Sequence, residues 1–369
     1  MTEHEYIRVN HQALKSFCAE VFRKLGMTPE QAEDSADILT AADARGIGSH
    51  GVARLWRYVN GIKTGVMNPA AEAETVRETP VSLVVDAKGV AGLSVSRQVM
   101  ERVIGKARAA GFAAASVRDS NHFGIAGYYA SMAVPEDMIG IAMTNTAALG
   151  VPTFGREAMF GTNPVAVAVP AEKMPPFVLD MATTVVTRGK VETYAREGNP
   201  LPIGWAVDTE GKNSGDAGSL LRDMLVQAGG GLLPLGGIGE FLGGHKGYGL
   251  GVLVDIMTAV TSGGTFGKEV MDTEKTSARV CHFFAAVKID LFRDPAEFKA
   301  DMDVMLSRLT SAEPAEGEDR VYYAGLKEHE HQEYCRKHGI GVPEKVWTNL
   351  LEIARELNID PAVLDRHIV

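Results

Sequence analysis

The chain has 369 residues, 45% of them hydrophobic and 23% charged, which is typical of a globular protein of about two domains. Its formal charge of -10 argues against a nucleic-acid-binding surface, and no apolar run approaches the ~20 residues that span a bilayer. The N-terminus lacks the apolar stretch of a signal peptide, and the three widely spaced cysteines suit a reducing compartment, so we expect a cytoplasmic protein that binds neither nucleic acid nor membrane.

The chain begins with predicted helices. From about Val9 to Ala44 apolar residues recur at helical spacing, with Gly26 ending the first helix and Thr28 capping the second. A third helix is predicted from Ser49, as its N-cap, to about Thr64.

Beyond Asn68 the pattern changes to strands, and it returns to helices from about Pro295, with a loop around residues 311–319. One helix is predicted at Ser94–Ala110, and the predicted strands are Val81–Val85, Ala113–Val117, Ile139–Thr144, Val165–Val169, Phe177–Asp180 and Val280–Ile289. The sequence therefore predicts an α/β (α+β) fold with two parts. Residues 76–294 form a strand-rich α/β domain, and residues 1–75 with 295–369 form a helical domain built from both termini.

One glycine motif is misleading. Gly46–Gly51 fits the dinucleotide fingerprint G-x-G-x-x-G, which works only where a strand turns into a helix. The residues before it are helical, so we predict that no Rossmann unit starts here. A Walker A loop is absent from the sequence, and we interpret the group at 329–338 (His329, Glu330, His331, Glu333 and His338) as a solvated helix face, not a metal site.

The densest group of reactive side chains lies in Ser49–Tyr58. On a helix, His50, Arg54 and Tyr58 would share one face because they are four residues apart. An imidazole exchanges a proton near neutral pH, and a guanidinium can hold a carboxylate through two hydrogen bonds. The pattern fits an acid–base site beside an anion site, and an ordinary polar helix face is the alternative.

Other segments place small and polar residues at strand edges or beside glycines. They are Ser120–Tyr128 with His122, Gly161–Pro164, Asp180–Thr184, Thr187–Lys190 and Gly243–Gly251. Exposed amides beside Lys and His could cradle a diphosphate, although each segment alone could be a turn.

In this order, the segments resemble the malate/L-lactate dehydrogenase family, which lacks a Rossmann fold and also includes ureidoglycolate, sulfolactate and diketogulonate dehydrogenases and cyclic-imine reductases. The resemblance covers most of residues 10–330. It rests on Ala42–Ile47, Ser49–Gly51, Asn121–Gly124, Gly161–Pro164, Asp180–Thr183, Gly189–Lys190, Gly204–Asp208 and Lys246–Leu250.

The resemblance implies a role for each matching position. His50 corresponds to the proton donor, Ser49 to its relay partner and Arg54 to the ligand of the substrate carboxylate. Further substrate contacts are implied at Tyr58, His122, Thr162, Arg188 and Gly189. Cofactor contacts are implied at His122, Phe123, Gly124, Ile125, Ala126, Asp180, Met181, Ala182, Lys190, His245, Lys246 and Gly325.

The chain departs from the family pattern at two positions. Lys190 stands where cyclic-imine reductases carry an aspartate, which disfavours that activity. Ala324-Gly325-Leu326 stands where relatives often have Pro-Gly-Glu, which puts the cofactor contact at Gly325 in doubt.

We therefore expect a homodimeric, metal-free oxidoreductase that moves a hydride between NAD, or NADP, and a small 2-hydroxy or 2-keto acid. Arg188 offers a second cationic fork besides Arg54, which favours malate or sulfolactate over lactate. The alternatives are a reductase of cyclic imines such as piperideine or pyrroline carboxylates, and a nucleotide-binding protein without turnover.

Overall fold

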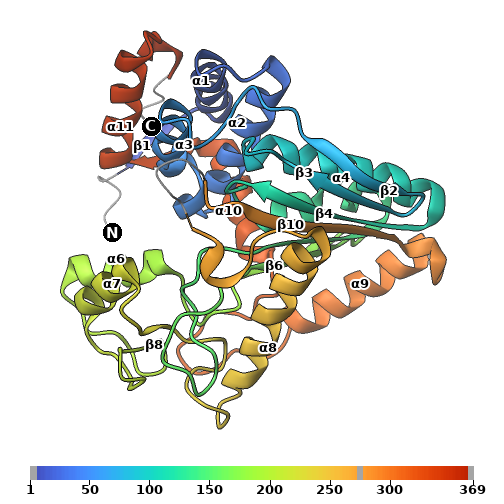
Figure 1. The fold of residues 1–369 in the computed structure, drawn as a ribbon. Coiled ribbons are helices and arrows are strands. Elements are labelled where there is room, and N and C mark those ends of the chain that lie inside the picture. Colours follow the sequence, from blue (N-terminus) through green and yellow to red (C-terminus); the bar gives the residue numbers. More distant parts are fainter. Residues whose placement is uncertain (1–5, 272–276, 365–369) are drawn as a thin grey trace.

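The computed structural model describes residues 6–271 and 277–364, which form a mixed α/β fold (Figure 1). Its centre is a seven-stranded sheet in the order β2-β3-β4-β10-β5-β6-β7, in which β3 and β4 pair in parallel and the other neighbours are antiparallel. The strands are β2 (Glu74–Thr79), β3 (Ser82–Asp86), β4 (Phe112–Ser120), β10 (Val280–Lys288), β5 (Met138–Thr144), β6 (Val165–Val169) and β7 (Phe177–Met181). The predicted α/β class is confirmed, and the mixed sheet is not that of a doubly wound Rossmann fold.

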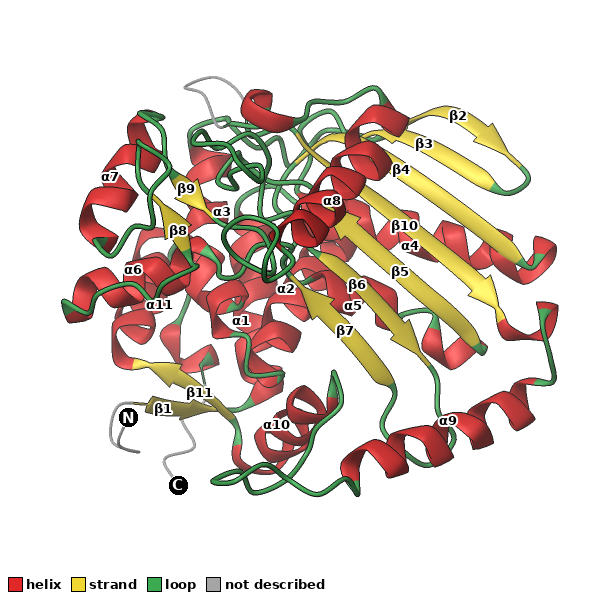
Figure 2. Ribbon diagram, turned by 90° about the horizontal axis from the view of Figure 1, so that it is seen from below, coloured by secondary structure: helices red, strands yellow, loops and turns green. Residues whose placement is uncertain are grey.

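Helices cover the two faces of the sheet differently. On one face lie α4 (Gly92–Ala110) and α5 (Ala126–Ser131), while α8 (Gly244–Asp255) runs across the other and continues as a π-helical turn, Ile256–Val260 (Figure 2). Along β5, residues facing α5 are buried, whereas the alternate residues are half-buried. The face that carries α8 is therefore the less covered one.

The two ends of the chain meet. Strand β1 (Tyr6–Val9) pairs with β11 (Ile340–Pro343). Three helices contact this pair, α2 (Pro29–Ala44), α10 (Leu326–His338) and α11 (Glu344–Glu356), and α1 (His11–Lys24) and α3 (Leu55–Lys63) pack on α2 and α11, respectively. Helix α9 (Pro295–Thr310) instead packs on residues of the β6–β7 edge of the sheet. The division at residues 75 and 295 stays a prediction.

A smaller unit follows β7. It contains α6 (Arg188–Glu197), β8 (Ala206–Val207), α7 (Ala217–Val226) and β9 (Gly231–Leu232), packed around their own apolar cluster. Among the described residues, none of the helices combines the length and apolarity needed to cross a membrane.

Several predicted boundaries agree with the structure, and some were wrong. Thr28 forms a complete capping box with Gln31, and Gly26, with φ +94°, follows the end of α1 as predicted. Val9, however, ends a strand, and β11 interrupts the helices predicted for the C-terminal part.

The largest correction concerns the helix predicted at Ser49–Thr64. Two 3-10 turns, Gly48–His50 and Val52–Arg54, precede α3, and Ser49 does not cap that helix. Gly51 between the turns has ψ -147°, which is not helical, so His50, Arg54 and Tyr58 do not lie on one helix face.

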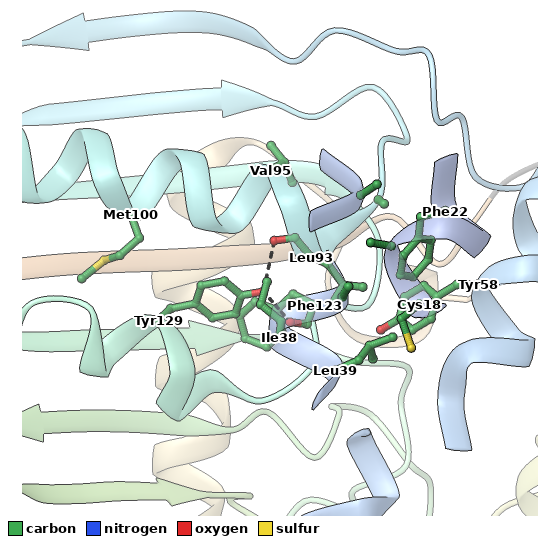
Figure 3. Packing of buried hydrophobic residues seen from close by; sticks show 14 of the residues in the cluster. Cys18, Phe22, Ile38, Leu39, Tyr58, Leu93, Val95, Met100, Phe123 and Tyr129 are labelled. Carbon is green, nitrogen blue, oxygen red and sulfur yellow. Dashed lines mark hydrogen bonds between the residues drawn. The ribbon is translucent and has the colours of Figure 1, made fainter. Parts of the chain in front are cut away.

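The core holds the loop that follows β4 in place. The Tyr129 hydroxyl donates to the carbonyls of Phe123 (2.5 Å) and Leu93 (3.3 Å), and the Phe123 and Tyr129 rings stack (Figure 3). The ring of His282, on β10, stacks on the ring of Phe123, with ring centroids 4.5 Å apart. The residue next to Phe123 is His122, so a rigid core fixes the base of this loop.

Candidate active site

Two histidines from distant parts of the sequence stack on each other. The His50 and His122 rings have centroids 5.5 Å apart and planes inclined by 24°. His50 ends the first 3-10 turn after α2, whereas His122 lies in the loop between β4 and α5. The helical part and the sheet therefore each contribute one imidazole to a common site.

The hydrogen bonds of His122 define its tautomer. The Tyr58 hydroxyl lies 2.6 Å from Nδ1, and the backbone amide of Gly124 donates to the same nitrogen (3.3 Å). An amide can only donate, so Nδ1 accepts and the ring proton lies on Nε2. Burial, followed by the charges of His50 and the nearby arginines, holds the pKa of His122 well below its usual value. His122 is thus a neutral hydrogen-bond donor.

His50 is oriented by its neighbours. Ser49 Oγ lies 2.9 Å from His50 Nδ1, and Arg54 Nε donates to the Ser49 carbonyl (2.7 Å), so the guanidinium is held beside the imidazole. Burial, followed by the positive charge of Arg54, lowers the pKa of His50 to about 4. At neutral pH His50 is therefore in its basic form, with Nε2 left for proton exchange.

The turn that carries His50 is anchored by Asp43, a residue to which the sequence reasoning gave no role. Its Oδ2 accepts the backbone amide of Val52 (2.7 Å). A Cβ on Gly51 would lie only 2.1 Å from the Asp43 carboxylate, so only glycine fits there. Burial raises the pKa of Asp43 to about 7. The available signal was a lone acidic residue among the alanines of α2.

A cavity of about 180 Å³ lies at the other end of the same loops. It is lined by Arg45, Ile47, Gly127, Ser131, Val134, Pro135, Pro176, Val178, Asp180, Gly325, Glu328, His329 and Gln332. Two of these, Asp180 and Gly325, are among the predicted cofactor contacts.

Asp180 is fixed at the wall of this cavity. Its Oδ2 accepts the amide of Gly127 (2.7 Å), and a Cβ on Gly127 would approach that oxygen to 2.9 Å. Asp180 as a whole residue is exposed, yet desolvation of its carboxyl group by the surrounding protein raises its pKa to about 6. Gly325, with φ +94°, lies against Val178, where a Cβ would lie 2.9 Å from the neighbouring backbone. Glycines thus allow two backbone segments to close around the cavity.

Thr162 lies in a separate polar group. Its amide donates to Thr146 Oγ1 (2.9 Å), and its carbonyl accepts from Thr183 (2.8 Å). The next residue, Asn163, donates to Asp255 on α8 (3.0 Å). Hydrogen bonds thus connect Thr162 to α8 and to the segment after β7.

The remaining predicted residues fall into two groups. Phe123, Gly124, Ile125 and Ala126 are buried in the His122 loop or at the start of α5, and Met181 and Ala182 end or follow β7. Gly189, Lys190, His245 and Lys246 lie in the first turns of α6 and α8. Arg188 forms an ion pair with Glu192 on its own helix (2.9 Å), and its side chain is 43% exposed.

Comparisons with known proteins agree with this architecture. Residues 9–351 match the family model described as malate/L-lactate dehydrogenase. The chain is 43% identical to a malate dehydrogenase of Pyrococcus abyssi, covering 97% of both chains, and 34% identical to an L-sulfolactate dehydrogenase of Methanocaldococcus jannaschii, covering 94% of this chain and 96% of that one. The crystal structure of malate dehydrogenase from Entamoeba histolytica aligns with a TM-score of 0.92 at 35% identity, covering 96% of this chain and 99% of that one.

Fold, site and relatives together define an oxidoreductase. The chain belongs to the malate/L-lactate dehydrogenase family, as the motifs in its sequence indicated.

Proposed function

We propose that this protein is an NAD-dependent malate dehydrogenase, which interconverts malate and oxaloacetate. The observation that carries the proposal is the neutral His50 held beside Arg54, an acid–base group next to a carboxylate ligand. The names of its relatives, malate dehydrogenase at 43% identity and sulfolactate dehydrogenase at 34%, support a small hydroxy acid with two acidic groups.

Each residue of the site has a distinct task in this proposal. Arg54 binds the substrate carboxylate and so places the 2-hydroxyl near His50. His50 Nε2 takes the hydroxyl proton during oxidation and returns it during reduction, while Ser49 keeps the imidazole oriented. The Nε2–H of His122, fixed by Tyr58, donates to a substrate oxygen.

The residues present fit a nicotinamide dinucleotide. The cavity is lined by apolar side chains together with two carboxylates, an arginine and a histidine, and its glycines leave room where a Cβ would collide. When bound, the nicotinamide supplies the hydride chemistry that the protein's side chains lack. Asp180, Gly127 and Gly325 would hold the nucleotide, together with the implied contacts in the His122 loop and at Met181, Ala182, Lys190, His245 and Lys246.

The second acidic group of malate requires a second cation. We keep Arg188 as the proposed ligand, with Thr162 and Gly189 as further substrate contacts; its ion pair with Glu192 would have to exchange for one with the substrate. Lys190, over the Tyr194 ring at 5.7 Å, occupies the position of the imine-reductase aspartate, so reduction of cyclic imines is the less favoured function.

We also propose a homodimer in the cytoplasm. Large apolar side chains are exposed along the outer face of α8 and the turn after it, among them Leu250 (38%), Leu253 (43%), Ile256 (45%) and Val260 (58%). They lie on the less covered face of the sheet, and a contiguous apolar surface of this kind marks an association site. Cys18, Cys281 and Cys335 are unpaired and buried, which suits a reducing compartment. Light scattering should give twice the chain mass, and a monomer at micromolar concentration would contradict the dimer.

The function is tested by a panel of 2-hydroxy acids with NAD and with NADP. We expect malate to give the highest kcat/KM, above lactate by at least ~10-fold. Binding of NADH without oxidation of any acid in the panel would overturn the proposal in favour of a nucleotide-binding protein without turnover.

A further inference from the structure

The cavity beside Asp180 shares its loops with the histidine pair. Ile47, in the cavity wall, lies just before the turn that carries His50, and Gly127 follows the loop that carries His122. A ligand with one end at the two imidazoles can therefore follow either loop into the cavity. In the proposed function that ligand is the dinucleotide, and the cavity receives its adenosine half.

The cavity is lined by both apolar and charged side chains. Val134, Pro135, Pro176 and Val178 provide apolar surface suited to a purine base. The titratable side chains that line it are Asp180, Glu328, Arg45 and His329. A base between apolar walls would therefore place its ribose among these charges.

The two carboxylates of the cavity share one guanidinium. Arg45 lies within electrostatic range of both Asp180 and Glu328, so one guanidinium faces two carboxylates. A ribose with a free 2′-hydroxyl can donate a hydrogen bond to a carboxylate, as in classical NAD sites. A 2′-phosphate, with a charge of about -1.5 to -2, would be repelled by both.

Of the two carboxylates, Glu328 is the one available to a ligand. Asp180 already accepts the Gly127 amide, whereas within residues 6–271 and 277–364 the half-buried side chain of Glu328 makes no hydrogen bond and has no cation within 4 Å, although Arg45 lies within electrostatic range. It lies in the first turn of α10, directly after the Gly325 turn that closes on Val178.

We infer that Glu328, supported by Asp180, binds the ribose 2′-hydroxyl of the adenosine half and selects NAD over NADP. The inference rests on the proposed function, because it needs a dinucleotide at the histidine pair. Glu328 would then be the residue that selects the cofactor. It lies two residues after Ala324-Gly325-Leu326, the segment that departs from the family's Pro-Gly-Glu pattern.

Binding of reduced cofactor, followed by its fluorescence, tests the inference independently of turnover. We expect the wild type to bind NADH at least ~10-fold more tightly than NADPH, and Glu328→Gln to remove most of that ratio, as the loss of one charge-assisted hydrogen bond predicts. Glu330→Gln is the matched control: Glu330 lies on the same helix, pairs with Arg320 and does not line the cavity. This variant should leave the ratio unchanged.

Three results would overturn the inference: equal binding of NADH and NADPH by the wild type, an unchanged ratio in Glu328→Gln, or an equal change in Glu330→Gln. Failure of the proposed function looks different. If no hydroxy acid is oxidised but NADH is preferred and Glu328→Gln removes the preference, malate dehydrogenase activity is wrong and the role of Glu328 stands. The kcat/KM ratio for the two cofactors with malate should follow the binding ratio.

Discussion

Binding of a keto acid should cause the protein to take up a proton. The pKa of His50 is about 4, because the ring is buried beside Arg54. A proton donor for reduction must be charged before it can act, so His50 needs a partner that raises its pKa. The substrate carboxylate on Arg54 offsets the arginine's charge and adds a negative charge near the ring.

The size of this effect follows from Coulomb's law. A carboxylate about 5 Å from the imidazole contributes about 3 kcal/mol at an effective dielectric constant of about 20, which is about 2 pKa units. The pKa of His50 would then rise from about 4 to about 6. At pH 6 the charged fraction changes from about 1% to about one half, so we expect an uptake of about 0.5 proton per site.

The uptake is measured by titration calorimetry in buffers of different ionisation enthalpy. Oxaloacetate is added to the protein saturated with oxidised cofactor, a combination that cannot react. His50→Asn is the control and should bind the ligand without proton uptake. Binding with no uptake by the wild type, or equal uptake by His50→Asn, would refute the assignment of His50 and the reasoning on its pKa.

Three further predictions concern single residues. His50→Ala should lower turnover by ~10²–10⁴-fold with nearly unchanged cofactor binding, and near-normal turnover would exclude His50 from the mechanism. Gly51→Ala should lower the free energy of unfolding in urea by ~1–3 kcal/mol, since its Cβ would collide with Asp43. Gly105→Ala, where the Cβ would enter open space on α4, is the control and should raise the free energy of unfolding by ~0.5–1 kcal/mol. Equal effects of the two substitutions would contradict this packing argument. Arg188→Ala should remove the preference for malate over lactate and leave lactate turnover unchanged; equal loss on all substrates would assign Arg188 to the nucleotide site.

The strands that the sequence revealed are those with a buried face. Val165–Val169 was predicted to the residue because β6 is a run of alternating Val and Ala with every second residue buried. Strand β2 was missed because Glu74–Thr79 is exposed along nearly its whole length and shows no apolar pattern. Strand β11 was missed because four residues between two helices give too short a signal.

The site was only partly accessible to sequence reasoning. Motif order pointed to the residues, but the contact between His50 and His122 depends on Tyr58 and Gly124, which are brought there by packing between the helical part and the sheet. A cation four residues from His50 already predicts a lowered pKa, yet burial, which a sequence pattern does not measure, contributes more. The role of Asp43 was missed because it depends on a hydrogen bond from the backbone amide of Val52, nine positions on, which the sequence does not reveal.

The misleading glycine motif gains a physical explanation from these contacts. Gly46, with φ +77°, leaves room for the His331 ring, which would lie 3.3 Å from a Cβ, and Gly51 leaves room for Asp43. The glycines of Gly46–Gly51 thus serve side-chain packing, with no strand before them to form a dinucleotide turn. Arg45 and Ile47 line the cavity and His50 stacks on its partner imidazole, so in the proposed function one short stretch of chain would join nucleotide binding to proton transfer. A shift of this loop would therefore change both together.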